Sequence, residues 1–183
     1  MTQSNQNQPS VVDKQAAIIT SKLEMMHVKP DFNQISMRTL GAMGQLSKIA
    51  MAKPAGNDEI RVEHIMGDIM VNTIIQAAIS NGIAAEAYKL SEGKVLNAAW
   101  HQPASALIQA TYCQYRVHAA SHDLWKMKLG ENPMEKDQFD VISHERAESL
   151  VNLYNALRTF AMLYNLDLEQ CLVAGVRRYN NKR

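Results

Sequence analysis

Two pairs of side chains in the second half of the chain have the spacing of a metal or proton-transfer site. His118 and His122 are four residues apart, so on a helix both imidazoles address one side. Glu145 and Glu148 form a similar stripe with Asn152. If these two segments are antiparallel helices, His118, His122 and Glu148 converge as metal ligands, and Glu145 or Glu148 positions a water molecule. The alternative is that all these side chains face solvent.

Asp68 is a carboxylate within the most apolar segment of the chain. Burying an isolated carboxylate costs on the order of several kcal/mol, so we expect this group to be paired or bound to a cation. His64 and Asn72 lie four residues on either side and share one helical face with it. The stripe indicates either a polar contact between helices or a ligand set in which His64 and Asp68 hold a metal.

The C-terminal segment is basic, with Arg177, Arg178 and Lys182 close together. Such a cluster can bind the phosphates of a nucleotide, or it can be a solvated helix end, where cations are favourable. Gly-rich phosphate loops, C-x-x-C pairs and G-x-S-x-G turns are absent from the sequence. Cys113 and Cys171 are expected to be core thiols rather than nucleophiles.

The elements that position these residues are predicted to be helices throughout, in an all-α helical bundle. Apolar residues recur with helical rather than alternating spacing, and eight Gly and five Pro are few for an all-β chain. We expect a disordered tail (1–10), an N-terminal helix (11–35), and two helical halves (36–100 and 101–183) that form one compact unit. The expected helices span 13–28, 36–53 with Ser36 as N-cap, 58–80, 84–99, 103–129, 141–164 and 168–180.

Five of the eleven methionines and four aromatic residues are expected to fill the core of this bundle. An adaptable, Met-rich binding surface is the alternative for the methionines, and stacking on a nucleotide base is the alternative for the aromatic residues. The residues concerned are Met37, Met43, Met51, Met66 and Met70, and the aromatic residues Trp100, Tyr112, Tyr115 and Trp125.

Three runs of sequence carry a family resemblance. They are Gly67-Asp68-Ile69-Met70 with the break Asn81-Gly82-Ile83, the run Leu166-Asp167-Leu168-Glu169-Gln170, and the run from Leu40 to Leu46. These resemble the "E-L-G-D-V-L…L-G-I-D-L-E-E" and "L-x-E-E-x-G-E-L" motifs of MazG-like, all-α nucleoside triphosphate pyrophosphohydrolases. The resemblance implies two diverged copies between Ser36 and Arg183, packed as two MazG-like halves, a nucleotide as ligand, and Mg²⁺ or Mn²⁺ as cofactor if the chain is active.

The sequence departs from that family at the metal-binding positions. The family uses an E-E-x-x-E helix and an E-x-x-D helix, because Mg²⁺ prefers several carboxylate oxygens. The first motif has no carboxylate here and reads Gly41, Ala42 and Gln45. The second keeps Asp68 but has Ile65 at the glutamate position, and the second copy has Asn152 at the Asp position. The pattern implies an eroded metal site, so whether the chain is an enzyme stays open.

A different family supplies an alternative arrangement of ligands. The dipeptide His122-Asp123 resembles the paired His-Asp of HD-type phosphohydrolases, with His101 and Asp167 as the further ligands. Asp167 also begins a capping box that ends at Gln170, which predicts a helix start at this point.

The overall charge limits the classes of partner. Nineteen basic and eighteen acidic residues give a formal charge of +1, which offers no general attraction to nucleic acid or to an anionic membrane. Two cysteines, no secretory signal pattern and no long apolar run favour a cytoplasmic protein. Two hypotheses follow: a MazG-like nucleotide-binding or pyrophosphohydrolase-related protein, or a non-catalytic helical scaffold that self-associates or binds a protein partner.

Overall fold

The computed structural model describes residues 9–27, 30–52, 58–80, 84–92, 102–131 and 133–181. These residues form seven α-helices and no strand, so the all-α prediction is confirmed. In chain order the helices are α1 (Val11–Met25), α2 (Phe32–Met51), α3 (Asp58–Ile79), α4 (Ala84–Glu92), α5 (Pro103–Lys128), α6 (Lys136–Met162) and α7 (Leu168–Asn181). Within the described ranges, no helix combines the length and apolar character needed to cross a bilayer.

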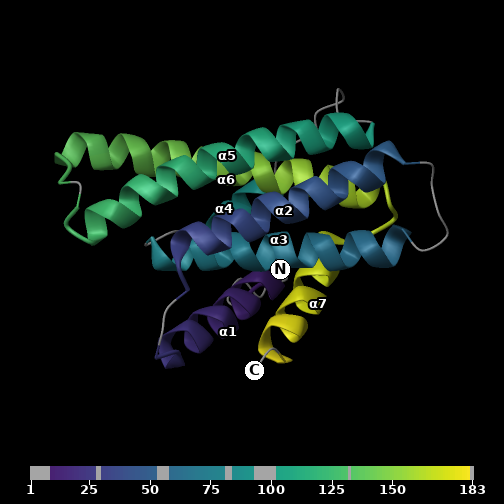
Figure 1. The fold of residues 1–183 in the computed structure, drawn as a ribbon, viewed down its shortest axis with the longest axis horizontal. Coiled ribbons are helices and arrows are strands. Elements are labelled where there is room, and N and C mark those ends of the chain that lie inside the picture. The colour runs from purple at the N-terminus through teal and green to yellow at the C-terminus, as the bar shows by residue number, and fades with distance from the viewer. Residues whose placement is uncertain are drawn as a thin grey trace, which may run out of the picture.

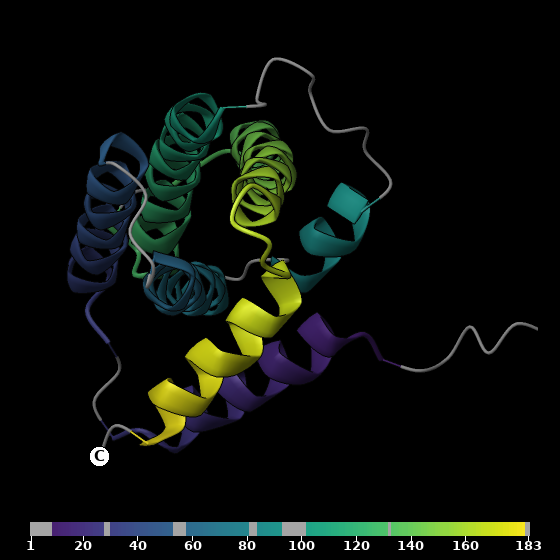
Figure 2. The same cartoon turned by 90° about the vertical axis from the view of Figure 1, so that its right-hand side faces the viewer.

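The four long helices α2, α3, α5 and α6 form the body of the molecule (Figure 1). Seen end-on, they surround a common axis in the order α2, α5, α6 and α3 (Figure 2). The two shorter helices α1 and α7 cross the outer side of α3, and α4 lies beside α6. One cluster of buried apolar side chains draws on all seven helices, so the two halves of the sequence share a single core.

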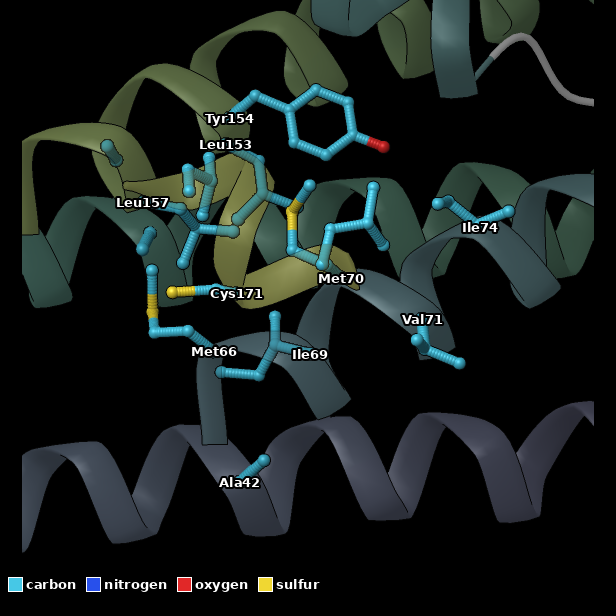
Figure 3. Packing of buried hydrophobic residues seen from close by; sticks show 14 of the residues in the cluster. Ala42, Met66, Ile69, Met70, Val71, Ile74, Leu153, Tyr154, Leu157 and Cys171 are labelled. Carbon is cyan, nitrogen blue, oxygen red and sulfur yellow. The ribbon is translucent and has the colours of Figure 1, made fainter. Parts of the chain in front are cut away.

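The centre of this core is α3, which is apolar on nearly every side, as its sequence predicts. Met66, Ile69 and Met70 of this helix are fully buried. They pack with side chains of α6 and α7, among them Leu157 and Cys171 (Figure 3). Each such buried side chain contributes roughly 1.5–3 kcal/mol of transfer free energy, which makes α3 the main organiser of the bundle.

Several helix ends lie where the sequence places them. Gly130, after α5, has φ +76°, and Asn165, after α6, has φ +55°, so both residues adopt the left-handed conformation that ends a helix. Asp167 Oδ1 accepts the amide N–H groups of Glu169 and Gln170 at 2.7 and 3.2 Å, which confirms its capping role. The predicted stop at Asn81-Gly82 and the loop at 54–57 lie outside the described residues.

Other predicted helix starts are wrong. Asp31, not Ser36, is the N-cap of α2, and its side chain accepts the Gln34 N–H at 2.9 Å. Ser36 is buried one turn inside the helix, where its hydroxyl hydrogen bonds the carbonyl oxygen of Phe32. The sixth helix begins at Lys136 rather than at residue 141. The sequence prediction missed its first turn because that turn is polar and largely exposed and carries no apolar period.

Two further boundaries are only partly described. Residues 1–8 of the predicted tail lie outside the described residues, whereas Ser10 is the N-cap of α1, in a capping box with Asp13. The fourth helix is described as far as Glu92, and the rest of its predicted span, residues 93–99, lies outside the described part.

A chain of buried polar side chains ties α2, α3 and α5 together. Gln76 Nε2 donates to Ser36 Oγ at 2.8 Å, and Gln114 Nε2 donates to Gln76 Oε1 at 3.2 Å. Thr73 Oγ1 lies 3.4 Å from Gln114 Oε1 at one end, and His118 Nδ1 lies 2.7 Å from Ser36 Oγ at the other. Because a buried amide without hydrogen-bond partners is costly, this row of hydrogen bonds specifies how the three helices align.

Two arginines of α6 bind the C-terminal ends of the first-half helices. Arg146 Nη1 donates to the carbonyl oxygen of Ser80 at 2.9 Å, just after α3. Arg158 Nη1 donates to the carbonyl oxygen of Ser91 at 3.1 Å, near the end of α4. Each guanidinium thus satisfies a carbonyl at the negative end of a helix. Burial lowers the pKa of Arg146.

Candidate functional site

A groove of about 770 Å³ opens between α1, α2, α3 and α7, and its size is typical of a small-molecule site. Its apolar wall comes mainly from α3, which contributes Ile65, Val71 and Ile75. The polar side chains that line it are Lys22, Arg38, Gln45, Asp68, Asn72 and Tyr179. Half of its described lining residues are therefore polar, which suits a ligand with several polar groups.

Two glycines allow α7 to reach the rim of this groove. Gly67 of α3 and Gly175 of α7 face each other where the two helices cross. A Cβ on Gly175 would lie 2.5 Å from the carbonyl oxygen of Gly67, and a Cβ on Gly67 would lie 2.8 Å from Arg178 Nη2. The two helices can therefore approach this closely only with glycine at both positions. Their close approach places Arg178 against α3.

The Arg178 guanidinium contacts two residues of the predicted polar stripe, Asp68 and His64. Its Nη2 lies 3.2 Å from Asp68 Oδ1 and donates to the carbonyl oxygen of His64 at 2.6 Å. The prediction that Asp68 is paired is therefore confirmed, with an arginine as the partner, but the expected burial is wrong, because the Asp68 side chain is 47% exposed. The contact to His64 is through its backbone, and the His64 side chain is exposed.

The groove carries more positive than negative charge. Lys22 and Arg38 line it, Arg178 borders it, and Asp68 is the one carboxylate among its described lining residues. Lys22 Nζ donates to the carbonyl oxygen of Tyr179 at 2.6 Å and lies 4.4 Å from the centroid of that ring. Arg38 is exposed and makes no hydrogen bond or ion pair within the described part of the chain. These charges favour an anionic ligand.

The predicted histidine pair lies elsewhere, in an aromatic cluster between α2 and α5. His118 stacks on Phe32 with ring centroids 5.3 Å apart, and His122 lies 6.1 Å from His118. Trp125 stacks on the same Phe32 ring at 5.4 Å. Burial, together with the neighbouring His122, lowers the pKa of His118. Both histidines therefore contribute to packing at this end of the bundle.

The predicted glutamates face outward from α6. Glu145 and Glu148 are both exposed, and Glu145 Oε2 lies 3.9 Å from Arg116 Nη2. Among the side chains that the structure describes, no three His, Cys, Asp or Glu groups lie close enough to hold one metal ion. The expected convergence of His118, His122 and Glu148 is not seen there.

The structure does not bring together the predicted HD-type ligands or the basic residues of the C-terminal cluster within its described part. His122 Nδ1 lies 3.9 Å from Asp123 Oδ1, but Asp167 caps α7, and His101 lies outside the described residues. In the basic C-terminal cluster, Arg178 turns toward α3 whereas Arg177 is exposed. Lys182 lies outside the described residues.

The thiols match their predicted structural role. Cys113 and Cys171 are both buried. Burial and the nearby acidic residues Glu63 and Asp167 raise the pKa of Cys171 to about 12, and burial raises that of Cys113. Neither group is a thiolate near neutral pH, so neither has the activated form that nucleophilic catalysis requires.

Sequence reasoning missed the groove residues Lys22 and Arg38, and it placed Gln45 at a motif position without giving this side chain a role. Arg38 and Gln45 are seven residues apart and flank Gly41, so they share one face of α2 with it. That spacing was the available signal. Lys22 had none, because only the crossing of α1 with α7 brings it to the groove. No protein-family model, curated protein or solved structure matches this chain.

Proposed function

We propose that the groove between α1, α2, α3 and α7 binds a nucleotide or a closely related phosphorylated metabolite. The observation that carries this proposal is that the groove joins unbalanced positive charge to an apolar wall. Arg38 and Lys22 supply cations for phosphate oxygens. Ile65 and the exposed Met26 supply an apolar surface against which a flat ring can lie. Such a division of chemistry within one site suits a ligand with an anionic end and a weakly polar body.

The two side-chain amides in the groove fit the same ligand class. Gln45 and Asn72 each offer a hydrogen-bond donor and an acceptor. Neither amide is hydrogen bonded to another described side chain, so each is available to a ligand. Amides of this kind can pair with the edge of a base or with ribose hydroxyls, whereas an inorganic phosphate would use only the cations.

The position of the groove agrees with the sequence resemblance. Gly41, Ala42 and Gln45 stand where MazG-like pyrophosphohydrolases have carboxylates on one helix, and all three line the groove. Ile65 and Asp68 stand at the carboxylate positions of the second motif, and they line it too. The motif positions of the resemblance and the lining of the groove therefore coincide. This agreement supports a nucleotide as the ligand of the groove.

The residues present do not fit the divalent cation that the resemblance implies. Mg²⁺ and Mn²⁺ prefer several carboxylate oxygens, but Asp68 is the single carboxylate among the described lining residues and already binds Arg178. The exposed Glu145 and Glu148 lie on α6, which contributes no described residue to the groove. We therefore propose that the groove binds the ligand, and we propose no hydrolysis there.

Isothermal titration calorimetry with a panel of nucleoside triphosphates, in EDTA and then in Mg²⁺, tests the proposal. We expect binding in EDTA and a weaker complex for Arg38→Ala. Loss of one charge-assisted hydrogen bond to phosphate costs about 1.5–3 kcal/mol, or roughly a 10- to 150-fold rise in Kd. Lys48→Ala is the matched control, because Lys48 is an exposed cation of α2 outside the groove.

Two results would contradict the proposal. One is the absence of heat and of any rise in melting temperature at millimolar nucleotide, because a ligand of the native state must stabilise it. The other is an equal loss of affinity in Arg38→Ala and Lys48→Ala, which would indicate general electrostatic attraction rather than a site in the groove.

A further inference from the structure

A second feature of the surface is apolar and lies on the other flank of α2. Met37, Leu40 and Met51 of this helix are exposed, as are Ile108, Tyr112 and Tyr115 of α5. We call these six residues and the surface between them the α2–α5 face. The exposed fraction is 77% for Met51 and 71% for Ile108, although both side chains are apolar. Exposed apolar side chains gathered in this way are typical of an interaction surface.

The face has both projections and a hollow. A cavity of about 520 Å³ lies between the two helices, lined by the small side chains Ala50, Ala104 and Thr111 as well as by the projecting Met51 and Tyr115. None of its described lining residues is charged. A surface that carries both knobs and holes can match itself, which is what an interface with two-fold symmetry requires.

The spacing along α2 is that of a helix seam. Apolar or small residues recur at intervals of three and four, at Met37, Leu40, Gly44, Ser47 and Met51. This is the heptad pattern with which one helix packs against another. A different face of α2 packs against the core of the bundle, through the buried residues Ile35, Met43 and Leu46. The seam is therefore not used by the contacts within one chain.

The face is large enough to form the centre of a dimer interface. Its six defining residues are between 43% and 77% exposed, and a standard interface buries roughly 800 Å² on each partner, spread over about 20–30 residues. An interface between identical copies is also more apolar than one between unlike partners, and its core is poor in charge. The cavity in the α2–α5 face meets the second condition, because none of its described lining residues is charged.

We propose that a second copy of this chain packs on the α2–α5 face, so that α2 and α5 of the two copies form a four-helix layer across a two-fold axis. Met37 and Met51 adapt to the partner surface, because methionine side chains are flexible and polarisable. The groove is on the opposite flank of α2, where Arg38 and Gln45 lie, so the dimer leaves it open. The inference does not depend on the proposed ligand.

Sedimentation equilibrium and multi-angle light scattering on the full chain test this inference. At about 50 µM we expect a mass of about 41 kDa, twice the 20.5 kDa of one chain. The double variant Met51→Glu/Ile108→Glu places four carboxylates in the interface, and its Kd should rise at least ~100-fold, which leaves a monomer. Circular dichroism should show an unchanged helix content, because both side chains are exposed.

The matched control is Val141→Glu/Met162→Glu. These two residues are exposed apolar side chains of α6, at 58% and 55%, and lie outside the face. We expect this variant to remain dimeric. A monomeric wild-type chain at about 50 µM, or a dimer that survives Met51→Glu/Ile108→Glu, would overturn the inference. Dissociation of the control alone would assign the interface to α6 and would overturn it equally.

Discussion

The crossing of α3 and α7 makes an exacting prediction for Gly175→Ala. The new Cβ would lie 2.5 Å from the carbonyl oxygen of Gly67, whereas ordinary contacts begin near 3.4 Å. Both groups belong to helix backbones, so no side-chain rotation relieves the clash and α7 must move away by about 1 Å. Forcing such overpacking costs about 1–3 kcal/mol and sometimes more. The better helix propensity of alanine returns only about 1 kcal/mol of this.

Gly41→Ala is the control for that substitution. Gly41 is a helical glycine whose Cβ would meet nothing within 4 Å. Alanine should therefore stabilise the protein at this position by up to about 1 kcal/mol. The same chemical change should have opposite signs at the two sites, and the difference comes entirely from tertiary contact.

Thermal and urea unfolding, followed by circular dichroism without ligand, measure both variants. In a chain of this length 1 kcal/mol corresponds to about 2–4 °C, so we expect Gly175→Ala to melt several degrees below the wild type and Gly41→Ala slightly above it. The displacement of α7 should also weaken the contact of Arg178 with Asp68. A Gly175→Ala variant as stable as Gly41→Ala would refute the account of how α7 reaches the groove.

Two further predictions concern the buried polar chain. Burial lowers the pKa of His118 below its ordinary 6.5, so the unfolded chain takes up the proton more readily and stability should fall as pH drops below about 6.5. His118→Asn removes this titration, and urea unfolding from pH 7.5 to 5 should show a flatter profile for the variant; parallel profiles would refute the assignment. Gln76→Leu should cost about 1–3 kcal/mol, because Ser36 and Gln114 lose a partner. In Gln76→Leu/Gln114→Leu the loss should be smaller than the sum of the two single losses, whereas strict additivity would show that the amides are not coupled.

The helices could be predicted from the sequence because the interactions that form and end them are local. A long apolar run identifies α3, and Gly130, Asn165 and Asp167 mark helix ends through their own backbone and side-chain preferences. Ser36 misled the same reasoning. Serine is a good N-cap, but Asp31 is one as well, and helix α2 starts where Phe32 and Ile35 can also be buried.

The residues of the site were harder to predict, because equal spacing does not reveal which side of a helix faces the core. His118 and His122 have the spacing of metal ligands, but His118 stacks on Phe32 and the tilted His122 ring lies 5.7 Å from the same Phe32 ring. Met37 and Met51 were expected in the core with Met43, but both are exposed on the α2–α5 face. Tyr112 and Tyr115 were expected to pack between helices and are exposed there too, while Trp100 lies outside the described residues.

By itself the sequence determined that the chain is helical and that α3 is its most apolar helix; it also predicted a partner for Asp68, although this side chain is 47% exposed rather than buried. Those conclusions depend on the transfer free energy of single side chains and on short-range periodicity, which the order of residues contains. Only the tertiary structure decided that the partner is Arg178 and that Lys22 and Arg38 share a groove with Asp68. Asp68 and Arg178 are 110 positions apart, and they meet because Gly67 and Gly175 let two helix backbones touch.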